Sequence, residues 1–238
     1  MSGNVLVIGA SGDIGISICK KLANQGFQLI LHYNTNKASV KQMREELPEH
    51  AILMEIQADL RDEYNVEKLL KTIVFPVDHL VFASGASDYG LFQNVTSERI
   101  NEMVALHVKA PLMITQYFIP GMIQKQQGKI ILITSVWGDI GASNEVIYST
   151  VKGAQNTFVK ALAKEMGPSN IQVNAVSPGF IDTKMNGHLL DEERNDIIAD
   201  IPLNRAGKPE DVANMVNFLL SDEASYVQGQ IIQVSGGW

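Results

Sequence analysis

The chain has 238 residues, of which 45% are hydrophobic and 19% charged, and 19 basic against 26 acidic side chains give a formal net charge of −7. This composition can bury a sizeable core, which excludes a disordered or fibrous protein. The acidic balance argues against binding to nucleic acid or to an anionic membrane, because phosphate contacts need clustered Lys and Arg side chains.

Short apolar runs alternate with longer amphipathic segments along the whole chain. The runs predict strands at residues 5–8, 27–31, 51–56, 80–83, 130–133, 171–176 and 230–234. Helical spacing joins Ile14, Ile18 and Leu22, and further helices are predicted at 66–73 and 148–166. Repeated β-α-β units predict a doubly wound parallel α/β sheet with ligands at the carboxyl ends of its strands. Without a repeat or linker, residues 1–238 are expected to form a single domain.

The first predicted strand ends in a glycine-rich turn that leads directly into a helix. The turn comprises Gly9, Ala10, Ser11, Gly12, Asp13, Ile14 and Gly15. Such a turn brings backbone N–H groups and the positive end of a helix close to a phosphate. A tight turn with no ligand is the alternative, but its place at the start of a β-α-β pattern favours a bound dinucleotide.

The ends of the second and third predicted strands bear on the choice of dinucleotide. The second strand leads into Asn34, and no acidic residue stands there to bind a ribose 2′-OH. Lys37 is the nearest cation, so NADP is favoured while NAD stays open; a solvated lysine at a helix start is the alternative. Asp59 and Leu60 follow the third strand, where the carboxylate either accepts from an adenine amino group or caps the next helix.

Tyr148 and Lys152 are four residues apart and therefore share one face of the predicted helix. A free tyrosine has a pKa near ~10, and an adjacent ammonium is expected to lower it. Tyr148 is thus a candidate general acid in reduction and general base in oxidation. Ser135 follows the strand at 130–133 and would meet Tyr148 at the same crevice, where its hydroxyl can hold a carbonyl. The alternatives are an ordinary amphipathic helix and a turn-forming serine.

These motifs, in this order, resemble the short-chain dehydrogenase/reductase family. The motifs are Gly9 to Gly15, Asp59, Ser135, Tyr148-Ser149-Thr150-Val151-Lys152, Asn174-Ala175-Val176-Ser177-Pro178-Gly179 and Val234-Ser235-Gly236-Gly237. Within the family the chain looks most like the 3-oxoacyl-[acyl-carrier-protein] reductases. The stretches behind that choice are 128–130, 161–165, 173–185, 202–205 and 207–212.

The resemblance implies a Rossmann-type sheet of about seven strands, an NAD(P)H cofactor, a homotetramer and hydride transfer to a carbonyl. By the same resemblance Ser135 positions the carbonyl, Tyr148 donates the proton, and Lys152 binds the nicotinamide ribose and supports the acidity of the tyrosine. Further cofactor contacts are implied for Ala83, Ser84, Gly85, Pro178, Gly179, Ile181 and Thr183. Two hydroxyls and a cation would stabilise the negative charge that develops on the substrate oxygen. We therefore expect NADPH-dependent reduction of a 3-oxoacyl thioester to the 3-hydroxyacyl form.

Several positions depart from the family pattern. Ile8 stands where the first motif has a threonine, and Gly12 where members that prefer NADP commonly have a basic residue. Asp13 replaces the middle glycine of the first motif; because a carboxylate repels a pyrophosphate, we expect it to point outward or to cap the helix. Ser84 is small enough to keep a close approach to adenosine. His107 stands where the family has the asparagine of its proton relay. Either it takes part in the relay and adds a titration near neutral pH, or it is a packed helix histidine.

Two further segments concern the substrate. Met185, Leu189 and Leu190 fall where the family carries a mobile lid and can cover an acyl chain; an amphipathic surface helix is the alternative. Lys129 matches a basic position of the acyl-carrier-protein reductases, whereas the second such position is Ser169, which is uncharged. Acyl carrier protein is therefore a possible partner, although the net charge of −7 does not help an acidic protein to dock.

Two other functions stay open on the sequence alone. One is a dehydrogenase of another alcohol, sugar or steroid, because the motifs handle the cofactor and the carbonyl rather than the rest of the substrate. The other is a weakly catalytic protein that senses the cofactor. No His/Cys spacing indicates a metal site. The single Cys19, the missing signal sequence and the lack of an apolar run of ~18 residues predict a soluble, cytoplasmic protein with no membrane partner.

Overall fold

The computed structural model describes residues 3–187 and 189–238. Seven strands form one parallel sheet in the order β3-β2-β1-β4-β5-β6-β7. The strands are β1 (Asn4–Ile8), β2 (Gln28–Tyr33), β3 (Ile52–Gln57), β4 (His79–Phe82), β5 (Gly128–Ile133), β6 (Ile171–Pro178) and β7 (Ile231–Val234). The strands predicted from the apolar runs are confirmed within one or two residues, because continuous apolar runs are buried on both faces of a parallel sheet.

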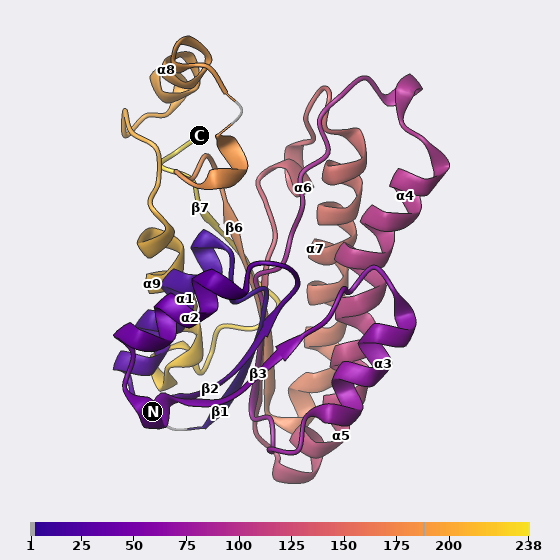
Figure 1. Cartoon of the computed structure of the whole chain (residues 1–238), viewed down its shortest axis with the longest axis vertical. Coiled ribbons are helices and arrows are strands. Elements are labelled where there is room, and N and C mark those ends of the chain that lie inside the picture. The colour runs from indigo at the N-terminus through magenta and orange to yellow at the C-terminus, as the bar shows by residue number, and fades with distance from the viewer. Residues whose placement is uncertain (1–2, 188) are drawn as a thin grey trace.

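Helices cover both faces of the sheet (Figure 1). One face packs against α1 (Asp13–Asn24), α2 (Lys37–Glu46) and α9 (Pro209–Leu220). The other face packs against α3 (Glu63–Thr72), α5 (Ala110–Lys125) and α7 (Val146–Met166). The short α6 (Trp137–Ile140) and α8 (Asp191–Asp200) lie beyond the ends of β5 and β6. The expected doubly wound architecture is confirmed, and no helix of the described residues is long and apolar enough to cross a membrane.

The strand order reverses next to β1, which places several strand ends around one crevice. Ile8 at the end of β1 is level with His32 on one side and with Phe82 on the other. The loops that follow β1, β4, β5 and β6 therefore all leave the sheet at the same edge. In doubly wound sheets this switch point is where ligands bind.

One helix on the second face contains an irregular turn. α4 (Ser97–Val104) passes through a π-helical turn, Ala105–Lys109, into α5. Pro111 has no N–H, so it cannot donate to the carbonyl of His107 four residues earlier, as an α-helix requires. The Ala110 N–H donates instead to the carbonyl of Ala105, five residues back. The proline thus accounts for a helical carbonyl, that of His107, with no α-helical donor.

Candidate active site

A cavity of about 1140 Å³ opens at the carboxyl edge of the sheet. Nearly all residues that the sequence nominated line it: Gly9, Ser11, Gly12, Asp13, Ile14, Gly15, Asn34, Leu60, Ala83, Ser84, Gly85, Ser135, Tyr148, Lys152, Pro178, Gly179, Ile181 and Thr183. Asp59 and His107 do not line it. Residues from six strand ends, distant in sequence, therefore meet in one space that is large enough for a dinucleotide and a substrate.

The glycines of the first turn are fixed by close packing. Gly9 has φ +86°, and a Cβ there would lie 2.4 Å from the backbone nitrogen of Ser84. A Cβ on Gly15 would lie 2.1 Å from the carbonyl oxygen of Gly9. Gly12, by contrast, is the exposed N-cap of α1 and supplies no side-chain cap. The first N–H groups of α1 are thus uncapped by a side chain at the cavity, as anion binding at a helix start requires.

His32 holds this turn in place, a role that the sequence did not indicate. Its Nδ1 accepts the Gly9 N–H at 3.2 Å, and its Nε2 lies 3.0 Å from the carbonyl oxygen of Ala58. Burial lowers the pKa of His32 to about 4, so the ring is neutral at physiological pH and can accept at one nitrogen while donating at the other. A single side chain therefore ties the ends of β1, β2 and β3 together.

Asp13 neither points away from the cavity nor caps α1, contrary to both expectations. Its carboxylate accepts the backbone N–H of Lys184 at 2.7 Å, and its Oδ1 lies 4.0 Å from the ammonium of the same residue. The bond joins the first turn to the segment that follows β6. The side chain lies on the cavity wall with one oxygen engaged, so the repulsion that it would exert on an anion is reduced rather than removed.

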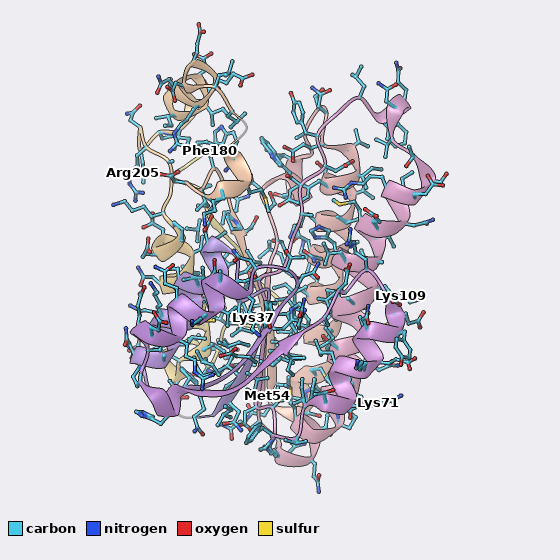
Figure 2. The ribbon with its side chains drawn as sticks, viewed as in Figure 1. Lys37, Met54, Lys71, Lys109, Phe180 and Arg205 are labelled. Carbon is cyan, nitrogen blue, oxygen red and sulfur yellow. The ribbon has the colours of Figure 1, made fainter. Side chains whose placement is uncertain are left out.

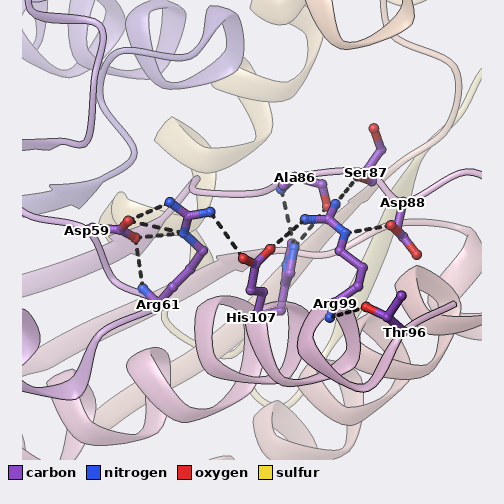
Figure 3. Close-up of polar contacts among 9 residues, drawn as sticks. Asp59, Arg61, Ala86, Ser87, Asp88, Thr96, Arg99 and His107 are labelled. Atoms are coloured by element: carbon purple, nitrogen blue, oxygen red, sulfur yellow. Dashed lines mark hydrogen bonds and ion pairs between the residues drawn. The ribbon is translucent and has the colours of Figure 1, made fainter.

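A chain of ion pairs edges the end of the cavity near β2 and β3 (Figure 3). We call this the adenosine end, because the sequence predicts the adenosine of a dinucleotide there. Asp59 forms a bidentate pair with Arg61, with an Nη2–Oδ2 distance of 2.6 Å. Arg61 reaches Glu102 at 3.7 Å, and Glu102 accepts from Arg99 at 3.1 Å. Arg99 also binds Asp88 at 2.6 Å. The capping interpretation of Asp59 is wrong, since the cap of α3 is Asp62, whose side chain accepts the Tyr64 N–H. The contact of Asp59 with an adenine amino group stays a prediction.

The cation expected near the second strand lies elsewhere. Lys37 is exposed at the first position of α2 and does not line the cavity (Figure 2). This agrees with the alternative interpretation, a solvated lysine at a helix start. Asn34, Thr35 and Asn36 line this part of the cavity without an acidic neighbour at the strand end. The cations that line the cavity at this end are Arg61, which follows β3 rather than β2, and Arg99 on α4.

Ser135, Tyr148 and Lys152 come together at the other end. The hydroxyls of Ser135 and Tyr148 form a hydrogen bond, and Ser135 Oγ also accepts the Trp137 N–H at 3.2 Å. The Lys152 ammonium lies 5.5 Å from the centre of the Tyr148 ring. It donates to the carbonyl of Ile133 at 2.8 Å, which fixes it at the end of β5. The two hydroxyls and the ammonium thus share one wall of the cavity.

The pKa of Tyr148 differs from the expectation. Burial raises it to about 12, Glu145 acts in the same direction, and the hydrogen bond from Ser135 only partly opposes them. Burial also lowers the pKa of Lys152 to about 7, so the expected cation is only partly charged at neutral pH. The sequence showed that a cation stood one turn away, but not that both groups lose water, and loss of water outweighs their attraction.

His107 is a packed histidine with no titration near neutral pH. Its side chain is 1% exposed, and burial lowers its pKa to about 3, with the charge of Lys152 adding to the effect. Its Nε2 lies 3.2 Å from the backbone nitrogen of Ala86 and 3.0 Å from its oxygen, and its ring meets the Tyr148 ring edge-on at 5.8 Å. Of the two interpretations, the packed histidine is the one that this environment supports, and a part in a proton relay stays a prediction. His107 meets the site through its ring, at Tyr148, and through its carbonyl, which accepts from Gln155.

The end of the cavity that holds Ser135, Tyr148 and Lys152 has an aromatic wall. We call it the substrate end, because the sequence predicts that Ser135 holds a substrate carbonyl there. Trp137 and Trp238 meet with ring centres 4.8 Å apart, and the ring centre of Phe180 lies 6.5 Å from that of Trp238. Met185 and Leu189 also line this end, as the lid expectation requires. Leu190 is 70% exposed and covers nothing, and residue 188 between them lies outside the described residues. No sequence pattern indicates that the two tryptophans meet, because one follows β5 and the other lies after β7.

These residues fit a nicotinamide dinucleotide. Uncapped N–H groups at the start of α1 suit a pyrophosphate, the cavity is continuous to Lys152, and the strand end after β2 carries no acid. Within residues 3–187 and 189–238, no group of His, Cys, Asp or Glu side chains is placed to hold a metal ion.

Comparisons with known proteins agree with this geometry. Residues 9–238 match the family model described as enoyl-(acyl carrier protein) reductase. The uncharacterized oxidoreductase YmfI of Bacillus subtilis (strain 168) is 46% identical over all of this chain and 99% of its own. The 3-oxoacyl-[acyl-carrier-protein] reductase FabG of Aquifex aeolicus is 36% identical over 98% of this chain and 95% of its own. A solved putative NAD(P) dependent gluconate 5-dehydrogenase from Beutenbergia cavernae, with bound NADP at low occupancy, superposes with a TM-score of 0.94 at 29% identity, covering 100% of this chain and 97% of that one.

Proposed function

The chain belongs to the short-chain dehydrogenase/reductase family and is an NAD(P)-dependent oxidoreductase, and on that premise we propose that it reduces 3-oxoacyl thioesters to 3-hydroxyacyl thioesters with NADPH. The cofactor would lie with its pyrophosphate at the start of α1 and its nicotinamide between Lys152 and the Pro178–Gly179 turn. When bound, it supplies the hydride that reduces the carbonyl carbon.

The observation that carries the proposal is the wall formed by Ser135, Tyr148 and Lys152. The Ser135 hydroxyl holds the substrate carbonyl oxygen beside Tyr148, with which it already forms a hydrogen bond. As the carbon–oxygen double bond opens, the oxygen gains negative charge, and the Tyr148 hydroxyl transfers its proton to it to give the alcohol. The Lys152 ammonium, held by the carbonyl of Ile133, stabilises the phenolate that remains.

The raised pKa of Tyr148 supports the direction of reduction. With a pKa of about 12 the phenol is fully protonated at neutral pH, as a proton donor must be. The reverse reaction would need the phenolate, which is scarce at that pH. We therefore propose that this chain works as a reductase.

The aromatic wall supports an apolar substrate. Trp137, Phe180 and Trp238, together with Met185 and Leu189, offer an apolar surface to a group attached to the carbonyl. An acyl chain gains from such a surface about 0.8 kcal/mol for each buried CH₂ group, whereas a polyhydroxylated sugar would lose hydrogen bonds to water. This favours an acyl compound over a sugar.

The preference for NADPH over NADH rests on the residues after β2. Asn34, Thr35 and Asn36 line the cavity there, and none of them carries the negative charge that would repel a 2′-phosphate. Arg61, which is paired with Asp59, and Arg99 are cations on the lining at this end. NADPH consumption should therefore exceed NADH consumption at equal concentration.

The charges around the site do not select one acyl carrier. Lys129 lies at the amino end of β5, opposite the cavity, where its ammonium is held by the carbonyl of Ser221. The lining at the substrate end includes Glu145, Glu193 and Asp196, which would repel an acidic carrier protein and the phosphates of coenzyme A alike. We propose that thioesters of both carriers are accepted.

We propose a homotetramer in the cytoplasm for the working enzyme. Leu112, Tyr117 and Ile123 are exposed apolar side chains on α5, and covering them would favour association. Cys19 is a free, fully buried thiol whose pKa is raised by burial, which suits a reducing compartment. Light scattering of the purified chain tests the tetramer.

The decisive experiment is a substrate panel with the purified chain. NADPH oxidation is followed with acetoacetyl-coenzyme A, acetoacetyl-acyl carrier protein, sugar acids and steroid ketones, and the thioesters should give at least tenfold higher kcat/KM. Faster turnover of a sugar acid or steroid would overturn the substrate assignment. Cofactor binding by calorimetry without turnover of any carbonyl would point to a cofactor-sensing protein instead.

A further inference from the structure

Ser135, Tyr148 and Lys152 form one wall of the cavity, which we call the reactive wall. One further buried side chain contacts it directly. Gln155 is 5% exposed and lies one turn after Lys152 on α7. Its Oε1 accepts from the Lys152 ammonium at 3.2 Å, and its Nε2 donates to the carbonyl of His107 at 2.7 Å. The orientation of the amide is fixed, since only its oxygen can accept from an ammonium and only its nitrogen can donate to a carbonyl.

The sequence explains why the carbonyl of His107 can receive this bond. Its α-helical donor would be the N–H of residue 111, which is a proline. The carbonyl belongs to the π-helical turn Ala105–Lys109, which packs against α7. A buried carbonyl without a hydrogen-bond donor destabilises the fold. Because Pro111 removes the helical donor, the carbonyl of His107 needs another one, and the Gln155 amide supplies it.

The same amide improves the hold on Lys152. The bond from Nε2 to the carbonyl polarises the amide and makes Oε1 a stronger acceptor. Two of the three N–H donors of Lys152 are then engaged, by Ile133 and by Gln155. Both partners are neutral, and the titratable groups beside the ammonium are Tyr148 on α7 and His107 on the π-helical turn.

We propose that Gln155 is a positioning residue, which holds the Lys152 ammonium at Tyr148 by bridging it to the His107 carbonyl that Pro111 leaves without a helical donor. The inference deepens the proposed function and rests on it for the role of Lys152. An amide has no proton to titrate near neutral pH, so the bridge orients the ammonium and favours its charged form rather than passing protons.

The test compares Gln155→Met with Gln228→Met. Gln228 likewise forms hydrogen bonds through both ends of its amide: Nε2 donates to the carbonyls of Ala163 and Ile171, and Oε1 accepts the Val173 N–H. It contacts no residue of the reactive wall. Removing the acceptor at Gln155 should lower the pKa of Lys152 by about one unit. Because that pKa is about 7, the charged fraction at pH 7 would fall from about one half to about one tenth. We expect about a fivefold loss of kcat/KM at pH 7 and a smaller loss at pH 6.

The primary readout needs neither cofactor nor substrate. The ammonium of Lys152 is titrated by NMR in the chain with isotope-labelled lysine, and Lys152→Met assigns the signal. Gln155→Met should move the titration to lower pH, and Gln228→Met should leave it in place. If no thioester is reduced by the wild-type chain, the proposed function fails, yet this titration still tests the bridge.

A second variant covers the case in which Gln155→Met does not fold. Pro111→Ala restores an N–H that competes for the carbonyl of His107, outside the reactive wall, and should shift the lysine titration in the same direction by a smaller amount. The proposal is overturned if Lys152 has the same pKa in Gln155→Met as in the wild-type chain. If Gln155→Met does not fold, an unchanged pKa of Lys152 in Pro111→Ala overturns it.

Discussion

The two ends of the cavity are held together by different kinds of interaction. At the substrate end, which holds the reactive wall, the polar groups are buried and bind neutral partners, as Lys152 does with the carbonyl of Ile133. At the adenosine end charged groups bind one another near the surface, with Arg61 and Glu102 side chains 44% and 42% exposed. Buried bonds are insensitive to salt, whereas exposed ion pairs are screened and individually weak. Geometry at the substrate end should therefore be fixed, and affinity at the adenosine end should depend on ionic strength.

The largest expected effect comes from removing the proposed proton donor, Tyr148. Tyr148→Phe should lower kcat by about 10³-fold, because general acid catalysis of this kind contributes about 10²–10⁴-fold. Cofactor affinity, measured by calorimetry, should stay within about threefold, since the phenyl ring remains. Tyr64→Phe is the control, because Tyr64 is 71% exposed on α3. A Tyr148→Phe variant with more than a tenth of wild-type kcat would contradict the assignment of the proton donor.

Next in size is the strain expected in the first turn, which both ends of the cavity share. Gly15→Ala places a Cβ 2.1 Å from a backbone oxygen, so the turn must move, and the free energy of unfolding should fall by about 3 kcal/mol or more. Gly121→Ala is the matched control on α5, where a Cβ would meet no described atom within 4 Å. That variant should gain up to about 1 kcal/mol from helix propensity. Urea unfolding measures both, and equal stability of the two variants would refute the packing argument.

A comparable effect is expected from acid at His32. The pKa of this residue is lowered from 6.5 to about 4 in the folded chain, so the unfolded chain binds its proton first. The stabilisation is thus complete above pH 6.5 and is lost as the pH falls toward 4, by roughly 3 kcal/mol. His32→Asn should flatten the dependence of urea unfolding on pH over this range. His50→Asn is the control, since His50 is exposed and should leave that dependence unchanged.

The smallest effect is expected from the exposed ion pairs. Arg61→Ala should change the free energy of unfolding by at most about 1 kcal/mol, because the guanidinium is largely hydrated. It should raise the KM for NADPH severalfold at low salt, with the difference from wild type narrowing as salt is added. Arg205→Ala removes an exposed pair with Asp211 away from the cavity lining and should leave that KM unchanged. A salt-independent effect of Arg61→Ala would remove the contrast between the two ends.

The sheet could be predicted from the sequence because its signals are local. Each strand is a short apolar run and each glycine turn follows one directly, so the order of elements and the edge that carries the cavity were both predictable. The same holds for the meeting of Ser135 with Tyr148, since strand ends and helix starts gather at one edge.

Contacts between distant segments could not be predicted in this way. Asp13 binds Lys184, which is 171 residues away, and no pattern in either segment indicates the other. The pKa of Tyr148 depended on depth of burial, which spacing does not report. One such contact does have a local signal. Pro111 stands four residues after His107, and this spacing predicts that the carbonyl of His107 lacks its α-helical donor.

The pairing of Trp137 with Trp238 allows ligand binding to be followed by the intrinsic fluorescence of the chain. The chain has two tryptophans, and both line the cavity in contact with each other. All indole emission therefore originates at the substrate end, and quenching by an arriving ligand is not diluted by reporters elsewhere. Occupancy can be followed in the unlabelled protein, one step at a time, before any chemistry is observed.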